Sequence, residues 1–275
     1  MAKIPLWRLM VDRRLVADRR EAERWILSGA VYTGSQRLDK PGQPLKADAP
    51  IAVRGLDRRY IGKGGYKLEG AIRQLGVPVA GRVAIDAGAC TGGFTDCLIK
   101  HGAKRVYAVE VGYGQLAGSL RQHPAVVNME RTNIGEVAGL DPQPDLASVD
   151  LSYLSLKKAV PIFAGICKTG ADLICLVKPL FEVDDMQARR SGVLPDDPET
   201  YRALLTELGE ALIAQGHRIL GACPSPVLGH SGTREFFLRV VTGAGESAPD
   251  WREQAQAASQ AVMRVVDRIG EGDFS

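Results

Sequence analysis

The sequence lacks several features that would place the chain in other classes of protein. Its 275 residues contain no apolar run near the ~18 residues that a transmembrane helix needs. Residues 1–5 (MAKIP) have none of the apolar core of a secretory signal. We also find no internal repeat and no low-complexity segment. These absences argue against a helical membrane protein, a secreted precursor and a repeat array. They leave a chain of ordinary composition, long enough for one large domain or two.

Cysteine and histidine are also sparse. The five cysteines are odd in number and include no C-x-x-C pair, and the four histidines show no metal-ligand spacing. We therefore interpret the cysteines as reduced thiols of a cytoplasmic protein and expect no metal site. Cys90 lies in a glycine-rich stretch, but no histidine stands at a spacing that would make it a nucleophile.

The charge is unevenly distributed along the chain. The overall net charge is +3, whereas residues 1–60 carry 13 Lys+Arg against 7 Asp+Glu, so the remainder is slightly acidic. Basic charge concentrated in one small segment favours a polyanionic partner held by that segment. A solvated basic face without a partner is the alternative that composition alone leaves open.

The patterns in residues 1–56 predict a compact α+β module. Apolar residues at helical spacing predict a first short helix between Leu6 and Leu15. Asp18 and Glu21 have capping-box spacing and open a second helix, which Gly29 is placed to end. Short apolar segments and turns then predict a small β element at 31–32, 34–35, 41–42 and 51–53.

This module resembles the S-four-type RNA-binding domain of ribosomal proteins and RNA-modifying enzymes. The matching residues are Arg8-Leu9, Arg19-Arg20-Glu21-Ala22, Ile26, Gly29-Ala30-Val31, Lys40-Pro41-Gly42 and Ile51-Ala52-Val53. Asp18 replaces the usual Ser, which is an equally good cap, and Thr33 replaces the usual Asn of the turn. The resemblance implies RNA binding by shape and backbone contacts. The RNA-binding residues it implies are Arg8, Arg19, Arg20, Arg24 and Lys40.

The stretch from Asp86 to Asp96 (DAGACTGGFTD) organises the rest of the chain. It follows the apolar run 83–85, which predicts a buried strand, and leads into a predicted helix. Its glycines allow a sharp turn and a close approach of backbone to ligand. The dinucleotide fingerprint G-x-G-x-x-G is absent, because Cys90 stands two residues after Gly88. The pattern resembles the first motif of S-adenosylmethionine-dependent methyltransferases.

Apolar runs alternate with helical patterns between residues 64 and 244, which is typical of a doubly wound α/β domain. We expect strands at 83–85, 105–109, 126–128, 146–149, 171–177, 217–222 and 235–241, and helices starting near Gly64, Gly93, Gln115, Leu156 and Pro198. Seven strands, with the last two closing the sheet, fit the Rossmann-like methyltransferase architecture better than a six-stranded dinucleotide fold.

Two further segments complete the expected organisation. Residues 57–63 form the expected linker, and residues 245–275 a C-terminal helical extension with apolar residues at helical spacing from Trp251 to Ile269. We expect this helix to dock on its own domain. A dimer or ribosome contact is the alternative, and the choice between monomer and homodimer stays open.

Ionisable residues follow several of the predicted strands. Asp86, Glu110 and Asp150 end three of them, and ligands of open α/β sheets bind at the carboxyl ends of strands. Lys178 follows the buried-looking run 173–177. Such a lysine can snorkel to solvent, but desolvation or a second nearby cation can make a lysine a general base near neutral pH.

The chain is similar over nearly its whole length to the TlyA family of FtsJ-type ribose 2′-O-methyltransferases. The FtsJ-type motifs are Gly64-Gly65-Tyr66-Lys67-Leu68, the 86–96 stretch, Val177-Lys178-Pro179 and Glu235-Phe236-Phe237-Leu238. The TlyA-type motifs are Gly112-Tyr113-Gly114-Gln115-Leu116, Glu130-Arg131-Thr132-Asn133, the 150–156 segment and Gly229-His230-Ser231-Gly232. The resemblance implies a cytoplasmic enzyme that methylates cytidine riboses of large-subunit ribosomal RNA, with small-subunit RNA left open as a second substrate.

The resemblance also implies the site residues. The catalytic tetrad would be Lys67, Asp150, Lys178 and Glu235, with Lys178 taking the 2′-hydroxyl proton, Asp150 and Glu235 orienting it and Lys67 holding the substrate. The S-adenosylmethionine-binding residues would be Asp86, Gly88, Gly92, Gly93, Phe94, Glu110 and Asn133.

The sequence departs from the family pattern at a few positions. Cys90 stands where Ser is common, Glu110 where Asp is common, and Gly62-Lys63 replaces the usual Ser-Arg. Two other functions stay open at this point. A membrane-active haemolysin, a label some relatives carry, would need a membrane segment that is not evident. A catalytically inactive RNA-binding protein would have lost tetrad positions, yet all four are present.

Overall fold

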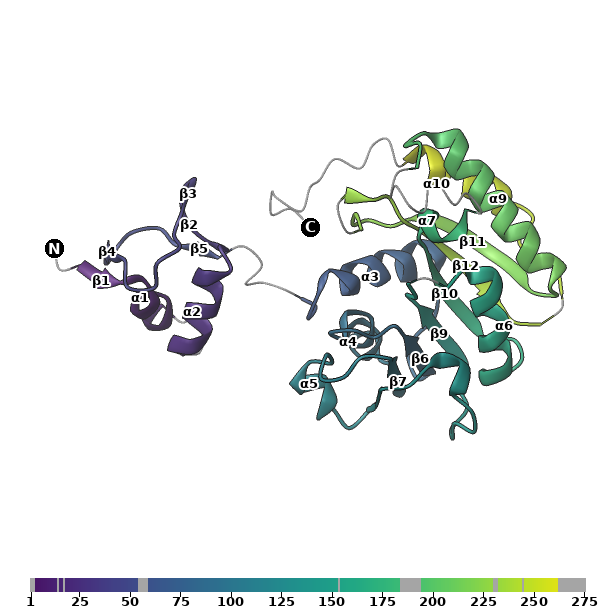
Figure 1. The fold of residues 1–275 in the computed structure, drawn as a ribbon, viewed down its shortest axis with the longest axis horizontal. Coiled ribbons are helices and arrows are strands. Elements are labelled where there is room, and N and C mark those ends of the chain that lie inside the picture. The colour runs from purple at the N-terminus through teal and green to yellow at the C-terminus, as the bar shows by residue number, and fades with distance from the viewer. Residues whose placement is uncertain are drawn as a thin grey trace. The chain divides into compact units, whose positions relative to one another are not determined.

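A computed structural model of the chain describes residues 3–13, 15–16, 18–53, 59–152, 154–183, 194–229, 232–243 and 245–261. The chain divides into two compact units, unit 1 (Met1–Arg59) and unit 2 (Tyr60–Ser275) (Figure 1). The division falls inside the segment 57–63 that the sequence suggested as a linker.

Unit 1 begins with the two expected helices, α1 (Leu6–Asp12) and α2 (Arg19–Leu27). Asp18 caps α2, because its Oδ1 accepts a 2.8 Å hydrogen bond from the Glu21 N–H. Gly29 follows the helix with a φ of 75°, a conformation that glycine adopts without strain. The small core of the unit consists of Leu6, Met10, Val16, Ala22, Ile26, Val31 and Leu38.

The strands of unit 1 form two small antiparallel sheets. One contains β3 (Gln36–Arg37), β2 (Val31–Thr33) and β5 (Ala52–Val53) in that order. The apolar segments at 31–32 and 51–53 suggested β2 and β5, whereas β3 was not expected. The other pairs β1 (Lys3–Pro5) with β4 (Pro44–Lys46) and was not expected. Strands of three residues are too short to show a period of two, so the sequence carries little signal for them.

Unit 2 is built on a seven-stranded sheet with the order β11-β12-β10-β9-β6-β7-β8. The strands are β6 (Val83–Ala87), β7 (Arg105–Glu110), β8 (Val126–Glu130), β9 (Leu146–Val149), β10 (Asp172–Val177), β11 (Arg218–Pro224) and β12 (Phe236–Val241). β12 is antiparallel to both of its neighbours, β10 and β11, and the other neighbouring strands of this sheet pair in parallel. The prediction of seven strands, with the last two closing the sheet, is confirmed.

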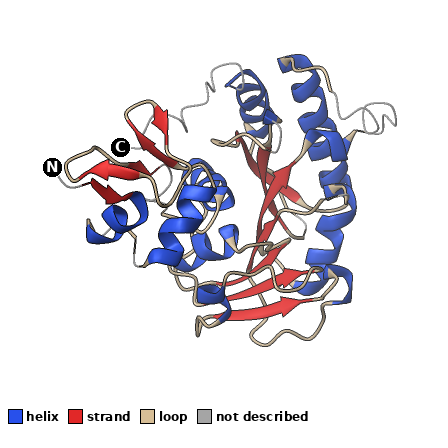
Figure 2. Ribbon diagram, turned by 60° about the vertical axis from the view of Figure 1, so that its left-hand side comes forward, coloured by secondary structure: helices blue, strands red, loops and turns tan. Residues whose placement is uncertain are grey.

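Helices cover both faces of this sheet (Figure 2). They are α3 (Lys63–Leu75), α4 (Gly93–Lys100), α5 (Gly118–Arg121), the 3-10 turn η1 (Ile134–Glu136), α6 (Leu156–Ile166), α7 (Pro179–Glu182), α9 (Pro198–Ala214) and α10 (Trp251–Ala261). One apolar core joins α3 and α4 to the sheet, and the other joins α6, α9 and α10. Unit 2 is therefore a three-layer α/β unit of the doubly wound type.

One helix starts later than expected. Helix α5 begins at Gly118 and not near Gln115, and its N-cap Ala117 has a non-helical backbone with φ −56° and ψ 140°. The Gln115 and Leu116 N–H groups before it donate to the Glu130 carboxylate at 2.6 and 3.0 Å. Helix α10 docks on α9 and β11 of its own unit, as expected. The later apolar positions of the expected C-terminal helix, Val262, Val265 and Ile269, lie outside the described residues.

Trp251 anchors α10. Its side chain is buried, and its ring occupies the space beside Gly209 of α9. A Cβ at Gly209 would lie 2.5 Å from a carbon of this ring, so only glycine leaves room for the indole there.

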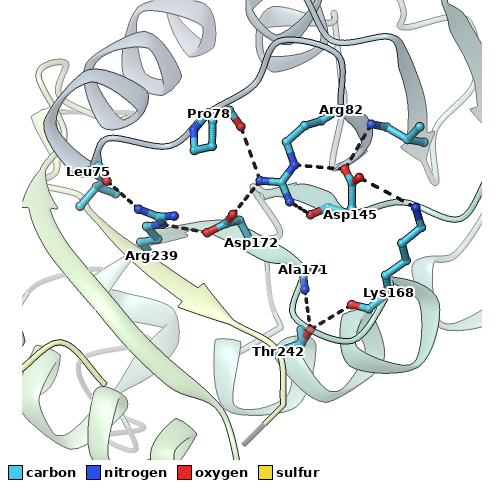
Figure 3. Close-up of polar contacts among 10 residues, drawn as sticks. Leu75, Pro78, Arg82, Asp145, Lys168, Ala171, Asp172, Arg239 and Thr242 are labelled. Carbon is cyan, nitrogen blue, oxygen red and sulfur yellow. Dashed lines mark hydrogen bonds and ion pairs between the residues drawn. The ribbon is translucent and has the colours of Figure 1, made fainter. Parts of the chain in front are cut away.

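An ion-pair network closes the sheet at the amino ends of its central strands (Figure 3). Asp172 accepts from Arg82 at 2.6 Å and from Arg239 at 2.8 Å. Arg82 also donates to Asp145 at 3.1 Å, and Arg239 to the Leu75 carbonyl at 3.1 Å. The network links β6, β10 and β12 at the amino ends of the parallel strands. The carboxyl ends, where ligands of open α/β sheets bind, lie at the opposite end of these strands.

Candidate active site

The turn between β6 and α4 requires glycine at two positions. Gly88 and Gly92 have φ values of 82° and 98°, in the left-handed region. A Cβ at Gly88 would also lie 2.2 Å from the Asp150 carbonyl oxygen, and one at Gly92 would lie 2.2 Å from Leu120 Cδ1. The residues between β6 and α4, 88–92, are called the glycine turn below.

The glycine turn borders a cavity of about 440 Å³ in unit 2, a volume that suits a small-molecule ligand. Its lining comes from the start of α3, the glycine turn, the start of α4 and the segments after β9 and β11: Gly62, Lys63, Gly64, Lys67, Gly88, Ala89, Cys90, Thr91, Gly93, Phe94, Asp150, Leu228 and Gly229. The α3 N-terminus approaches that of α4 closely, since a Cβ at Gly93 would lie 3.1 Å from the Gly65 nitrogen. An added Cβ at Gly64, Gly88 or Gly93 would press on neighbouring protein atoms, so these glycines let the elements around the cavity approach one another closely.

Four ionisable side chains meet at this cavity as two ion pairs. Lys67 Nζ lies 2.5 Å from Glu235 Oε2, and Lys178 Nζ lies 2.5 Å from Asp150 Oδ1. Lys67 and Asp150 line the cavity directly, and a Cβ at Gly229 of the lining would lie 2.3 Å from Glu235 Oε1. The Lys67–Glu235 side chains are the more enclosed pair, 12% and 6% exposed against 20% and 25% for Lys178 and Asp150.

Electrostatics also link the four groups. Burial raises the pKa of Glu235 above its ordinary value, and the Asp150 charge acts in the same direction, whereas Lys67 and Lys178 oppose it. All three other groups are therefore near enough to act on the Glu235 carboxylate. The structure brings together the four residues, from four distant parts of the sequence, that the resemblance placed in a tetrad.

The Asp86 carboxylate lies beneath the glycine turn and is fully buried. It accepts hydrogen bonds from Thr95 Oγ1 at 2.6 Å and from Ser148 Oγ at 2.8 Å. Burial raises its pKa to about 6, although both hydroxyl donors act to lower it. Asp86 thus ties β6 to α4 and β9, and its oxygens are engaged by protein hydroxyls.

Glu110 and Asn133, the other polar residues expected at the cofactor, are also engaged with backbone. Glu110 accepts from the Cys90 N–H at 2.9 Å and from the Gly112 N–H at 2.8 Å, which links the end of β7 to the glycine turn. Asn133 is exposed and caps η1 by accepting from the Gly135 N–H at 3.0 Å.

Comparisons with known proteins agree with this architecture. Residues 60–241 match the FtsJ-like methyltransferase family. The chain belongs to the TlyA family of FtsJ-like methyltransferases. A relative from Mycobacterium tuberculosis, named 16S/23S rRNA (cytidine-2′-O)-methyltransferase TlyA, is 39% identical over 94% of this chain and 95% of its own. "Putative rRNA methyltransferase YqxC" of Bacillus subtilis is 38% identical over 94% of this chain and 91% of its own. A solved structure titled "Putative hemolysin from Streptococcus thermophilus" is 30% identical with a TM-score of 0.73, and covers 98% of this chain and 99% of that one.

The cofactor of FtsJ-like methyltransferases, S-adenosylmethionine, fits the residues at the cavity. The cavity is large enough, five glycines in its lining admit close contact with backbone, and a carboxylate, Asp150, lies at its edge. A carboxylate suits a ligand that carries a sulfonium and an ammonium group.

Sequence reasoning missed one member of the TlyA-type site. Lys178 Nζ lies 3.3 Å from Ser152 Oγ, so the ammonium has a hydroxyl partner besides Asp150. Ser152 belongs to the TlyA-type 150–156 motif, but the resemblance gave it no role at the site. Tyr153, His230 and Ser231, which belong to TlyA-type motifs, lie outside the described residues.

The cysteines, all of which lie in unit 2, are free thiols, with no disulfide among the residues that the structure covers. Cys97, Cys167, Cys175 and Cys223 are buried, and burial raises the pKa of the Cys167 and Cys223 thiols to about 12. Cys90 is exposed in the glycine turn at a φ of 49° and donates its backbone N–H to Glu110.

The basic residues expected to bind RNA are all exposed on unit 1. Arg8, Arg19 and Arg24 pair with acids one helical turn away, at distances of 3.7, 2.8 and 3.6 Å. Arg20 and Lys40 form no ion pair with another described residue. Exposed pairs of this kind contribute little to stability, so an anionic partner can compete for the three paired arginines as well as for Arg20 and Lys40.

None of the described helices has the length and apolar character needed to span a bilayer.

Proposed function

We propose that this protein transfers a methyl group from S-adenosylmethionine to the 2′-hydroxyl of a cytidine ribose in ribosomal RNA. The observation that carries the proposal is the meeting of Lys67, Asp150, Lys178 and Glu235 beside the glycine-lined cavity. The name of the Mycobacterium tuberculosis relative, which specifies cytidine 2′-O-methylation of 16S and 23S rRNA, supports the choice of large-subunit RNA with small-subunit RNA as a second substrate.

Lys178 is the proposed general base. A ribose hydroxyl is a poor acid, so a positioned base and close alignment are the main contributions the protein can make. Bound S-adenosylmethionine supplies an electrophilic methyl group on a sulfonium. The ribose oxygen would accept this methyl group, with sulfur keeping the electron pair of the broken carbon–sulfur bond, and the protein's own contribution is at the hydroxyl proton. Lys178, which is paired with Asp150 as an ammonium, must first release a proton to solvent; its amine then takes the hydroxyl proton and becomes an ammonium again.

Asp150 and Ser152 hold Lys178 in place. The ammonium that forms lies against Asp150 Oδ1 at 2.5 Å, where its positive charge is stabilised, and the Ser152 hydroxyl at 3.3 Å accepts a further hydrogen bond. Ser152 is exposed, so it offers the proton a path to solvent after each turnover.

Lys67 and Glu235 are proposed to position the substrate. Lys67 lines the cavity, and its pairing with the buried Glu235 fixes its ammonium group there. From that place Lys67 can donate to the ribose or to a neighbouring phosphate. The pairing also compensates the buried charge of Glu235, whose pKa burial raises.

Unit 1 is proposed to act as an S-four-type RNA-binding domain. Two short helices, a small sheet and an excess of exposed basic residues suit contacts with a folded RNA backbone. We further propose a cytoplasmic location, where ribosomal RNA is found.

Methyl transfer from radiolabelled S-adenosylmethionine to purified ribosomal subunits tests the proposal, together with a map of 2′-O-methyl groups in the product RNA. We expect label at a cytidine ribose. Liposome leakage, measured beside it, tests the haemolysin alternative. Leakage without methyl transfer would favour a membrane-active protein, and RNA binding without transfer would favour an inactive RNA-binding protein.

A further inference from the structure

Glu130, the last residue of β8, collects donors from the segment 112–117. Its Oε1 accepts from the Gln115 and Leu116 N–H groups at 2.6 and 3.0 Å, and its Oε2 lies 3.2 Å from Arg121 Nη2. Asn128 also donates to Oε2 at 3.2 Å. The bonds from the Leu116 N–H, the Asn128 amide and the Gln115 N–H lower the pKa of Glu130 to about 2, and its side chain is only 5% exposed. The carboxylate is therefore charged at any working pH.

The segment that Glu130 holds rests directly on the glycine turn. The Ala117 N–H donates to the Thr91 carbonyl at 3.2 Å. Leu116 and Leu120 are buried against Gly92, where an added Cβ would lie 2.9 and 2.2 Å from their Cδ1 atoms. A shift of residues 112–117 would therefore be transmitted to Thr91 and Gly92.

Backbone bonds close the arrangement from the other side. The Arg131 N–H donates to the Gly112 carbonyl and the Thr132 N–H to the Glu110 carbonyl, each at 3.0 Å. The Glu110 carboxylate bonds both Gly112 and Cys90 of the glycine turn. The end of β8, the segment 112–117 and the glycine turn thus form one connected unit.

Glu130 itself does not line the cavity, so it can act on the cofactor only through other residues. We propose that Glu130 is a positioning residue that fixes the glycine turn for S-adenosylmethionine through the segment 112–117. The inference rests on the proposed function only in assigning this cavity to that cofactor, and it does not depend on which RNA is methylated.

Calorimetric titration of the full-length protein with S-adenosylmethionine, without RNA, tests the inference. Glu130→Ala removes every acceptor, whereas Glu130→Gln keeps one oxygen for the two N–H groups but loses the charge. Glu246→Ala, an exposed acid in the loop before α10, is the matched control. We expect Kd to rise about tenfold or more for Glu130→Ala and less for Glu130→Gln, because hydrogen bonds to a charged group are the stronger ones. The control should bind as wild type does.

A merely structural role is separated by kinetics and thermal unfolding. In methyl transfer from labelled S-adenosylmethionine to ribosomal subunits, KM for the cofactor should rise with Kd. The kcat at saturating cofactor should stay within about twofold of wild type. If Glu130→Ala does not fold, Glu130→Gln carries the test. Unchanged Kd in a folded variant, or a fall in kcat with unchanged KM, would overturn the inference. Absence of cofactor binding by the wild-type protein would overturn the proposed function as well, whereas failure to methylate RNA with tight cofactor binding would leave the role of Glu130 intact.

Discussion

The Lys178 ammonium lies 2.5 Å from Asp150 Oδ1, and the two residues directly follow the neighbouring parallel strands β10 and β9. Side chains at the carboxyl ends of adjacent parallel strands are held by the sheet itself, so their geometry costs little further ordering. Lys67 and Glu235 form a second pair from α3 and the start of β12. The site therefore separates into a pair for proton transfer and a pair for substrate.

Removal of the proposed base should abolish most methyl transfer without loss of cofactor. Lys178→Ala is expected to lower kcat by about 10²- to 10⁴-fold, the usual contribution of a general base. Binding of S-adenosylmethionine should stay within about twofold of wild type, because Lys178 is not part of the cavity lining. Lys158→Ala, an exposed lysine of α6, is the control for loss of a charge. Wild-type turnover in Lys178→Ala would rule out the proposed base.

Loss of the Ser152 hydroxyl should have a smaller effect on the same step. Ser152→Ala removes the hydroxyl partner of Lys178, so we expect kcat to fall about three- to tenfold, the effect of one modest hydrogen bond, with KM for the cofactor unchanged. Ser152→Thr keeps the hydroxyl and should recover most of the rate. Equal rates for the Ala and Thr variants would show that the hydroxyl plays no part.

Asp86 should make stability depend on pH. Burial raises its pKa from 3.8 to about 6, so between these values the folded protein holds a proton that the unfolded chain has released. Stability therefore falls as pH rises through this window, by about 3 kcal/mol at 1.36 kcal/mol per pKa unit. Asp86→Asn carries no such proton, and its amide can still bond the Thr95 and Ser148 hydroxyls. Urea unfolding should show the variant gaining about 3 kcal/mol relative to wild type between about pH 4 and pH 7. A flat difference over that range would contradict the buried-acid explanation.

The network at the amino ends of the strands should contribute to stability and not to chemistry. Asp172→Asn leaves the largely buried Arg82 and Arg239 side chains without their shared counter-charge, and we expect a loss of about 3–5 kcal/mol in unfolding free energy. Lys168→Ala, whose exposed ammonium ends 4.0 Å from Asp145 at the rim of the network, should cost less than about 1 kcal/mol. Folded Asp172→Asn should bind S-adenosylmethionine normally. A comparable loss in both variants would mean that the buried charges are not what matters.

The basic residues of unit 1 should govern RNA affinity and its dependence on salt. Arg20→Ala and Lys40→Ala are each expected to weaken binding to ribosomal RNA and to reduce the slope of log K against log salt by about one. Cofactor affinity should not change. Gln36→Ala, an exposed neutral residue of the same unit, serves as the control. Salt slopes identical to wild type in both charge variants would remove these residues from the RNA contact.

The sequence carried most of the information on the sheet and less on the side-chain partners. The seven strands were predictable because most contain a distinct apolar run, such as 173–177, set off by polar residues or turns. The short strands β1 and β4 have no comparable pattern. The start of α5 was misplaced because residues 115–117 precede the helix in a non-helical conformation, held by long-range bonds from the Gln115 and Leu116 N–H groups to Glu130 that leave no periodicity to detect.

The members of the candidate site could be identified, but their pairing could not. Resemblance to a family supplied the four ionisable residues, yet it did not show that Glu235 pairs with Lys67 while Asp150 pairs with Lys178. Ser152 was part of a matching motif but had no assigned role, because only its distance to Lys178 distinguishes it from the other residues of the segment. Such relationships depend on where helices and strands place side chains in space.

Trp251 fills the space beside Gly209, and this contact has a consequence for shortened forms of the protein. A version ending at Val241 would keep the cavity and all four ionisable groups, but it would uncover an indole-sized hollow on α9 and the face of β11 that α10 covers. Exposed apolar surface of this kind promotes self-association. Trimming by a protease in the loop before Trp251 would thus yield a molecule with intact chemistry and poor solubility.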